Sequence, residues 1–252
     1  MNRIHENDIV LPALFFMSKQ NGMQITTTKL KQFLLAAMHP QGEDALILNG
    51  RNDSRFTQIV RNLKSHDTLE RLKFATYDNG RFTITCKGLS FVEKNIDSIE
   101  YLINEGFAYD DMREAFKTIA EHPKEKIIPF NEIIAEGITV KTTNKRVQRS
   151  QKLRASALEF YSNNGHIVCD CCGFDFKTAY APDYECECIE IHHKKPIFLY
   201  GINDVQNTID EALQNLMPVC PNCHRVIHKM NIGSEQFPAF KKFIKIKLHA
   251  HL

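Results

Sequence analysis

Two CxxC pairs constrain this chain more than any other part of its sequence. Cys169-Asp-Cys-Cys172 is followed by Gly173, and Cys220-Pro-Asn-Cys223 is followed by His224. The CxxC spacing lets two thiolates converge on one ion, so the two pairs together predict a tetrahedral Cys₄ zinc site. Gly173 permits the tight turn of a zinc knuckle. Cys171 could in principle replace Cys169 or Cys172, but the spacing and the glycine favour the outer two.

The composition is that of an ordinary globular protein. The 252 residues are 43% hydrophobic and 25% charged, which suffices to bury a core. The N-terminus lacks the apolar stretch of a secretory signal, and no apolar run approaches the ~20 residues of a membrane span. We therefore expect a soluble, cytoplasmic protein with no membrane partner, in which a disulfide framework is disfavoured. Cys186 and Cys188 are interpreted as loop thiols, with a second metal site as the alternative, and Cys86 as a small strand residue.

Residues 1–95 follow the pattern of three helices and a hairpin. Apolar side chains recur at helical spacing in residues 9–17, 30–38 and 56–63. Residues 72–78 and 81–86 alternate around Asn79-Gly80, which predicts a two-residue hairpin turn. A closing helix is expected to start at Thr85. The candidate caps of the second and third helices are Thr26, Thr27 or Thr28, and Asp53 or Ser54.

This order is that of a winged helix. The strings DIVLPAL (8–14) and ITxxG (84–88) resemble the N-terminal winged-helix domain of Mrr-type restriction enzymes. The resemblance implies a DNA-reading domain, although winged helices also serve as protein–protein modules. In a DNA reader the third helix would enter the major groove and the hairpin would contact the backbone. The side chains expected at DNA are Arg55, Gln58, Arg61 and Arg81.

Histidines accompany the cysteine pairs. Residues 189–193 predict a short strand that ends in His192 and His193, and strand neighbours point to opposite faces. His224 and His228 are four residues apart on the helix expected after the second CxxC, so both project from one face. One strand histidine and this pair make a three-ligand set with open positions, the form of a catalytic metal site.

The ordered motifs resemble the HNH, or ββα-metal, endonuclease family, in the Cys₄-zinc branch that includes McrA-like restriction enzymes. The matching strings are CxxCGF (169–174), IEIHHKKP (189–196), NL (215–216) and VCPNCHRVIH (219–228). The resemblance implies an α+β fold. Its expected domains are a winged helix (1–95), a helical connector (96–140) that could also dimerise, and a C-terminal ββα-metal nuclease domain (141–252) with a structural zinc.

The family resemblance also implies roles for individual residues. His193 would be the general base that takes a proton from water, and Asn215 would orient it by hydrogen bonds to it or near the strand. A divalent ion on His192, His224 and His228 would bind the phosphate, and the products would carry 5′-phosphate and 3′-hydroxyl ends. Three imidazoles suit Zn, Ni or Mn better than Mg, and the family often has Asp or Asn here, so Mg²⁺, Mn²⁺, Ni²⁺ and Zn²⁺ all stay open.

The expected partner is double-stranded DNA. Residues 141–252 are net basic, whereas residues 1–140 are net acidic. Residues 141–158 contain no acidic side chain, and beside a nuclease motif such a run favours phosphate contacts over a solvated helix face. One HNH unit cuts one strand, so a homodimer would be one route to double-strand cleavage. The basic residues of this run are Lys141, Lys145, Arg146, Arg149, Lys152 and Arg154, and Lys194, Lys195 and Arg225 lie nearer the motif.

Two rival functions remain open at this point. A zinc-dependent DNA-binding regulator would use the same fold without cutting, but would not need His193, Asn215 and both helix histidines. The other is a nuclease acting on RNA, or a toxin delivered to other cells. The reader-like domain and the lack of a secretory signal weigh against the toxin. Glu190 is interpreted as a structural strand residue, with support of a ligand histidine as the alternative.

Overall fold

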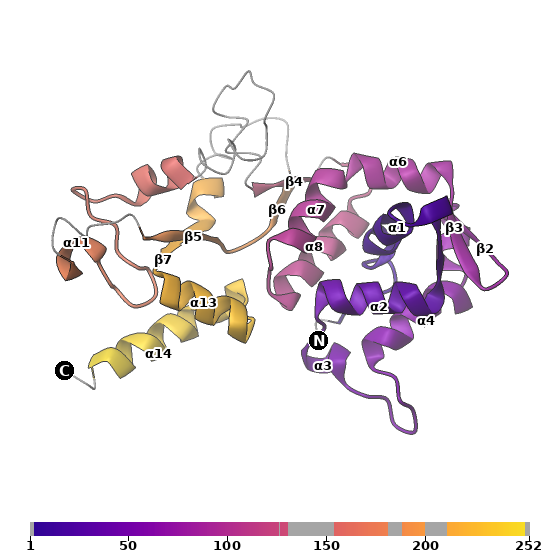
Figure 1. The fold of residues 1–252 in the computed structure, drawn as a ribbon, viewed down its shortest axis with the longest axis horizontal. Helices are drawn as coiled ribbons and strands as arrows, with labels where there is room; N and C mark the ends of the chain where they lie inside the picture. Colours follow the sequence, from indigo (N-terminus) through magenta and orange to yellow (C-terminus); the bar gives the residue numbers. More distant parts are fainter. Residues whose placement is uncertain (1–2, 126, 131–153, 181–187, 200–210, 250–252) are drawn as a thin grey trace, which may run out of the picture. The chain divides into compact units, whose positions relative to one another are not determined.

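The computed structural model describes residues 3–125, 127–130, 154–180, 188–199 and 211–249 (Figure 1). The chain divides into two compact units, residues 1–127 and residues 128–252, and each is described by itself. We call them the first unit and the second unit. Among the described residues, no helix is both long and apolar enough to span a bilayer.

The first unit is built around α1 (Val10–Ser18), whose residues are buried from Val10 to Phe15 and again at Met17. A helix that is apolar on all sides must be covered by other elements. Here α2 (Thr27–Met38), α6 (Cys86–Lys94), α7 (Ile96–Asn104) and α8 (Tyr109–Glu121) pack against it. The helices α7 and α8 thus belong to this core, in the stretch 96–140 that the sequence predicts as a connector.

Side-chain caps begin several of these helices. Thr26 accepts a hydrogen bond from Lys29 N (3.2 Å) at the start of α2. Ser54 accepts one from Thr57 N (3.2 Å) at the start of α4 (Arg55–Ser65), which packs on α2. Each cap satisfies a backbone N–H that lacks a partner within its helix. The structure therefore selects Thr26 and Ser54 from the candidates that the sequence offered.

A small antiparallel sheet completes the first unit. It contains β1 (Gln24–Thr26), β2 (Ala75–Asp78) and β3 (Arg81–Ile84) in the order β1-β3-β2. Asn79 and Gly80 join β2 to β3 with φ of 47° and 77°, so the predicted hairpin is confirmed. Short helices, α3 (Gly42–Ala45) and α5 (Thr68–Arg71), flank α4, and the 3₁₀ turn η1 (Asn21–Met23) precedes β1.

Gly88 allows α6 to approach the end of this sheet closely. A Cβ placed on Gly88 would lie 2.2 Å from the carbonyl oxygen of Phe74, which is far inside van der Waals contact. The Gly88 N–H also donates to Thr85 Oγ1 (3.1 Å), the cap of α6. The string ITxxG therefore has a packing reason for its glycine and a capping reason for its threonine.

A buried carboxylate fastens α8 to the rest of the first unit. Asp44 is 1% exposed and accepts hydrogen bonds from Tyr109 Oη (2.7 Å) and from the backbone N of Ile4 (3.3 Å). The guanidinium of Arg113 lies 3.9 Å away. Burial, followed by the bond to Asp44, raises the pKa of Tyr109 far above its usual range. A buried charge without such partners would be strongly destabilising, so these contacts hold residues 4, 44 and 109 together.

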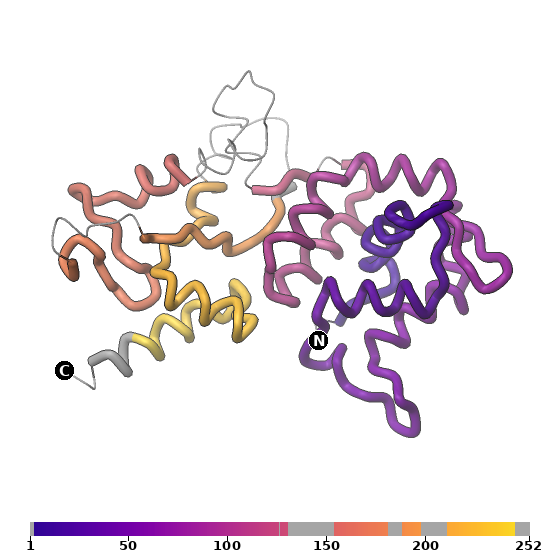
Figure 2. The backbone as a smooth tube through the Cα atoms, viewed as in Figure 1, coloured from indigo at the N-terminus to yellow at the C-terminus, as the bar shows by residue number. Residues whose placement is uncertain are grey.

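The second unit carries a strand pair followed by a helix. The strand β5 (Glu190–His193) pairs antiparallel with β7 (Leu216–Val219), so that His192 lies opposite Met217 and His193 opposite Leu216. The chain then enters α13 (Pro221–Met230), and the tube in Figure 2 shows β7 leading into this helix. A second strand pair is formed by β4 (Ile127–Pro129) and β6 (Ile197–Leu199).

The core of the second unit lies between α13, α14 and the β5–β7 pair. Ile227 of α13 packs with Met217 and Val219 of β7 and with Phe237, the first residue of α14 (Phe237–His249). Asn231 ends α13 in the left-handed region (φ 51°), and the 3₁₀ turn η3 (Ser234–Gln236) then leads into α14. A short helix, α11 (Phe176–Ala179), follows the first CxxC pair.

Candidate metal centres and nuclease site

The four predicted cysteine ligands converge in the second unit. The sulfur atoms of Cys169, Cys172, Cys220 and Cys223 all lie within 4.8 Å of one another, and Cys172 Sγ is 3.9 Å from Cys220 Sγ. For Zn–S bonds of about 2.3 Å, tetrahedral geometry separates the sulfurs by roughly 3.8 Å, so the spacing fits one zinc ion.

The backbone explains why these sulfurs meet. Gly173 adopts φ 76° and its N–H donates to Cys169 O (2.8 Å), which closes the tight turn of the first pair. Cys220 is the N-cap of α13, and its sulfur accepts from Cys223 N (3.4 Å). The second pair is therefore fixed by the start of a helix, with Pro221 at its first turn.

The protonation of the cluster also favours a cation. Hydrogen bonds from the thiols of Cys171 and Cys223 hold the pKa of Cys169 well below its usual range. The same bond to Cys169 raises the pKa of Cys171 to about 12, and burial raises that of Cys172 to about 11. Cysteine binds zinc as the thiolate, so metal binding would release the protons of these thiols.

Cys171 lies next to this cluster without belonging to the four-sulfur group. It is fully buried and packs in the core with Ile189 and Val219. The structure therefore supports the outer two cysteines of the first segment as ligands, as the spacing predicted. Cys188 is disulfide-bonded, which differs from the loop thiol expected there, and Cys186 lies outside the described residues.

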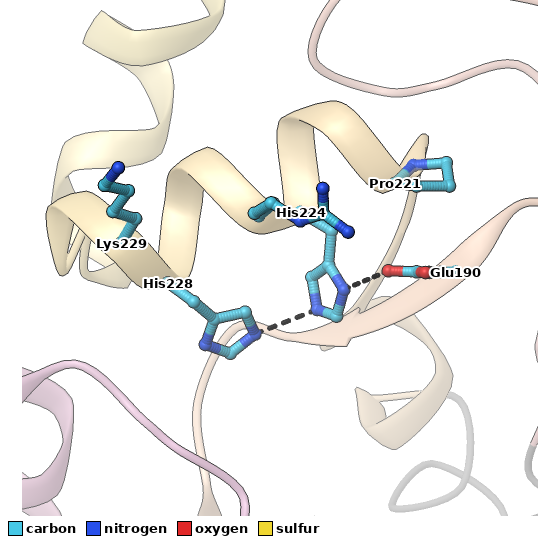
Figure 3. Close-up of a pocket in the computed structure, with 6 residues that line it drawn as sticks. Glu190, Pro221, His224, His228 and Lys229 are labelled. Carbon is cyan, nitrogen blue, oxygen red and sulfur yellow. Dashed lines mark hydrogen bonds and ion pairs between the residues drawn. The ribbon is translucent and has the colours of Figure 1, made fainter.

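The predicted histidine ligands form a second cluster. The ring nitrogens of His192, His224 and His228 come within 4.8 Å of one another. His224 and His228 stand one turn apart on α13, with their Nε2 atoms 2.9 Å apart (Figure 3). His192 comes from β5, and its ring centre is 5.2 Å from each of the other two.

This trio suits a divalent ion by its donor chemistry. His192 is 7% exposed, and burial, followed by the three neighbouring histidines, lowers its pKa to about 3. It is therefore neutral at physiological pH, the form in which imidazole binds a metal. Two Nε2 atoms at 2.9 Å need a proton or an ion between them, and an ion can serve all three rings.

His193 is separate from that trio. Its alternation with His192 along β5 places the two side chains on opposite faces of the strand. Burial, followed by the charge of His224, lowers the pKa of His193 to about 4, so its imidazole is neutral at physiological pH. A neutral imidazole keeps a lone pair that can accept a proton.

Asn215 fixes the chain immediately after His193. Its Oδ1 accepts from Lys195 N (2.9 Å) and its Nδ2 donates to Lys195 O (2.7 Å), while Lys194 N donates to Asn215 O (2.9 Å). Of the two roles that the sequence left open for Asn215, the hydrogen bonds are those near the strand. The side chain thus acts on the His193 backbone through the residues that follow it.

Tyr161, which no sequence pattern indicated, contacts the backbone around Asn215. Its hydroxyl donates to the carbonyls of Leu216 (2.7 Å) and Leu213 (3.1 Å), which flank Asn215. Burial, followed by Asp170, raises the pKa of Tyr161 to about 12. No local pattern identifies this contact, because 52 residues or more separate the partners.

Glu190 also enters the site. It lies at the start of β5, and its Oε2 pairs with Nδ1 of His224 (Figure 3). The contact differs from the preferred interpretation of Glu190 as a structural strand residue and fits the alternative, in which Glu190 supports a histidine of the predicted ligand set. An open hollow surrounds the pair and is lined by Glu190, Pro221, His224, Arg225, His228 and Lys229.

The candidate nucleic-acid contacts fall into separate groups. Arg225 lines the hollow beside the histidines, and Lys194 is half-buried, with its pKa lowered by burial and then by Lys241. In the first unit Arg81 begins β3 and is exposed. Arg146 and Arg149, with Lys141, Lys145 and Lys152, lie outside the described residues, whereas Arg154 donates to Ile189 O (3.1 Å).

The polar face of α4 forms a bonded array. Gln58 Oε1 accepts from Arg61 and also from Arg51, each at 2.9 Å. Arg61 pairs with Asp53 (2.6 Å), and Arg55 pairs with Glu43 (3.0 Å). Arg51, which no sequence pattern indicated, thus joins this group from the loop before α4.

Residues 169–230 match the family model described as HNH endonuclease. This segment, which contains both CxxC pairs, β5, Asn215 and α13, is therefore an HNH endonuclease domain whose cysteine cluster fits the zinc-binding form. The match supports nuclease activity. No curated protein and no solved structure matched the chain.

We expect Cys171→Ala to keep one tightly bound zinc per chain and Cys223→Ser to lose it, because only Cys223 belongs to the four-sulfur group. Loss of a structural zinc also unfolds the segment it closes. Zinc content by mass spectrometry of the purified variants, together with thermal unfolding, checks both. Full zinc in Cys223→Ser, or none in Cys171→Ala, would contradict the assignment.

Proposed function

We propose that this HNH endonuclease domain makes the protein a metal-dependent DNA endonuclease of restriction type. The observation that carries the proposal is the placement of two adjacent histidines on opposite faces of β5. His192 joins His224 and His228 in a metal-binding trio, and His193, desolvated and neutral, lies on the other face of the same strand.

In the proposed reaction His193 acts as the general base. Its imidazole takes a proton from a water molecule whose oxygen attacks the scissile phosphorus. The bond from phosphorus to the 3′ oxygen breaks, and the leaving oxygen takes a proton from solvent water, so that one product ends in 5′-phosphate and the other in 3′-hydroxyl. A divalent ion held by His192, His224 and His228 would neutralise charge on the phosphate and on the leaving oxygen.

Asn215 and Tyr161 would act by positioning. Asn215 ties residue 195 to the start of β7, and Tyr161 holds the carbonyls on both sides of Asn215. A general base must stay within hydrogen-bond reach of the proton that it removes. These contacts restrict the backbone that carries His193, so their role is to keep the imidazole in place.

His193→Ala should lower the rate of plasmid cleavage by about 10²–10⁴-fold, the usual contribution of a general base. Zinc content and DNA retention should not change, because His193 is in neither metal group. Cleavage is measured on a plasmid pool with Mg²⁺, Mn²⁺, Ni²⁺ and Zn²⁺ in turn, and ligation of the products tests for 5′-phosphate ends.

The matched control is His166→Ala, which removes an exposed histidine that pairs with Asp175 in the same unit. Equal cleavage by His193→Ala and the parent would reject His193 as the base. Retention of DNA without cleavage by the parent in every metal would favour the zinc-dependent DNA-binding regulator instead.

The pH dependence tests the same imidazole. A general base works when unprotonated, so a lowered pKa extends its activity towards acid pH. With the pKa of His193 at about 4, we expect kcat/KM to fall less than about twofold between roughly pH 7.5 and 6. A histidine of ordinary pKa, about 6.5, would lose about fourfold. Metal must be saturating at each pH, and a loss of about fourfold under those conditions would contradict the desolvated base.

The first unit is proposed to be the DNA reader, as a winged helix. Its helices α1, α2 and α4 and its sheet order β1-β3-β2 support that interpretation. In this fold the third helix enters the major groove, which would present Gln58 and Arg61 of α4 to base edges, with Arg51 beside them. A reader joined to a nuclease is the arrangement that a restriction function needs, and a homodimer would let one HNH site act on each strand.

Arg61→Ala and Arg51→Ala should each weaken duplex DNA binding. Where the lost contact is to a phosphate, the slope of log affinity against log salt should fall by about 1. The measurement is fluorescence anisotropy over a salt series, in the His193→Ala background to prevent cleavage. Lys117→Ala removes the same charge from α8 and should leave binding unchanged. If Arg61→Ala and Arg51→Ala bind duplex DNA as tightly as the parent, α4 is rejected as the reading element.

A further inference from the structure

Glu190 and His224 meet across two elements that the sequence keeps far apart. Glu190 opens β5, and His224 lies in the first half of α13. Glu190 is two residues before His192, so both side chains point to the face of β5 that lies towards α13. There Glu190 Oε2 contacts His224 Nδ1 (Figure 3).

This contact leaves the other ring nitrogen of His224 on the side of the cluster. His224 Nε2 lies 2.9 Å from His228 Nε2, in the group that also contains His192. A neutral imidazole has one N–H and one lone pair. A carboxylate at Nδ1 holds the hydrogen there, so the lone pair must be at Nε2, where a metal would sit.

We propose that Glu190 is a positioning residue that fixes the tautomer and ring orientation of His224 for metal binding. The inference rests on the proposed function for the metal site itself. A carboxylate on the outer nitrogen of a ligand histidine also raises the basicity of the inner nitrogen, and loss of such a partner commonly costs about 10–100-fold in metal affinity.

Direct ligation by Glu190 is the competing role. Among the described residues, His192, His224 and His228 form a group whose possible metal-binding atoms all lie within 4.8 Å of one another. Glu190 does not belong to this group. Its carboxylate is instead occupied by Nδ1, on the far side of the imidazole from the cluster. Glu190 therefore acts on the metal through His224.

The test measures Ni²⁺ binding by isothermal titration calorimetry on the full chain, after confirming one retained zinc per chain. Glu190→Ala should bind Ni²⁺ about 10–100-fold more weakly than the parent. Glu190→Gln should lose less, because its amide oxygen can still accept from Nδ1. Glu159→Gln removes one exposed carboxylate elsewhere in the unit and should leave the affinity unchanged.

A double mutant separates positioning from ligation. If Glu190 acts through His224, then Glu190→Ala should cause no further loss of Ni²⁺ affinity in a His224→Ala background. A further loss of about tenfold or more there would overturn the proposal, as would parent-like affinity in Glu190→Ala or equal losses in Glu190→Ala and Glu190→Gln. The visible absorption of bound Co²⁺ provides a spectroscopic check, since its bands should move in Glu190→Ala and not in Glu159→Gln.

The outcome for Glu190 is independent of catalysis. If the parent binds Ni²⁺ and Glu190→Ala weakens it while no DNA is cut, the proposed function fails and this inference stands. If DNA is cut and the affinity does not depend on Glu190, the inference fails and the function stands. A parent that binds no second metal overturns the inference, whatever its activity.

Discussion

The thiolate cluster is the constraint on which the site depends. It joins the turn at residues 169–173 to the first turn of α13, and Cys220 takes part both as a ligand candidate and as the N-cap of that helix. The direction of α13 is thereby set where the helix begins. His224 and His228 lie further along the same helix, so the position of the cluster decides where their imidazoles stand. A hydrogen bond from Asp170 N to Pro218 O (2.8 Å) ties the same turn to β7. A zinc ion would lock these segments together.

The alternation of β5 divides the chemistry between two faces. His192 faces the imidazoles of α13, and His193 faces away. In the proposed function, these adjacent residues would hold a metal and serve as a base. A slip of one residue in the β5–β7 register would exchange these roles, because side chains alternate with a period of two. Register therefore matters more here than in a structural hairpin. The contacts of Asn215 with Lys195, together with the pairing of His193 and Leu216, hold that register at the end nearest the base.

Features with a local cause could be predicted from the sequence. The Asn79-Gly80 turn needs positive φ at both residues, Ser54 and Thr26 cap helices within three residues, and CxxC spacing brings two thiolates together. The i, i+4 histidines were likewise fixed by helix geometry. Contacts between distant segments could not be predicted in this way. Tyr161 meets the carbonyls beside Asn215, and Tyr109 meets Asp44, each through a fold that no single segment encodes. For Glu190, support of a ligand histidine was an alternative from the sequence, but the partner His224 became known only from the fold. The sequence predicted a connector where α7 and α8 lie, because their packing on the apolar helix α1 is also a contact between distant segments.

The charge pattern of α4 indicates how the two units would contribute to DNA affinity and to sequence discrimination in the proposed function. Arg55 and Arg61 already pair with Glu43 and Asp53, so a phosphate would have to compete with these carboxylates. Exposed ion pairs are weak, and such competition costs little, but it cancels much of the long-range attraction that arginines exert on DNA. Residues 1–140 carry a net negative charge, which also disfavours long-range attraction to DNA, whereas residues 141–252 are net basic. In the proposed function, most of the salt-dependent affinity would then come from the second part of the chain. The first unit would contribute mainly discrimination between DNA sequences, because contacts of Gln58 and its neighbouring arginines with base edges depend on sequence, whereas phosphate contacts do not.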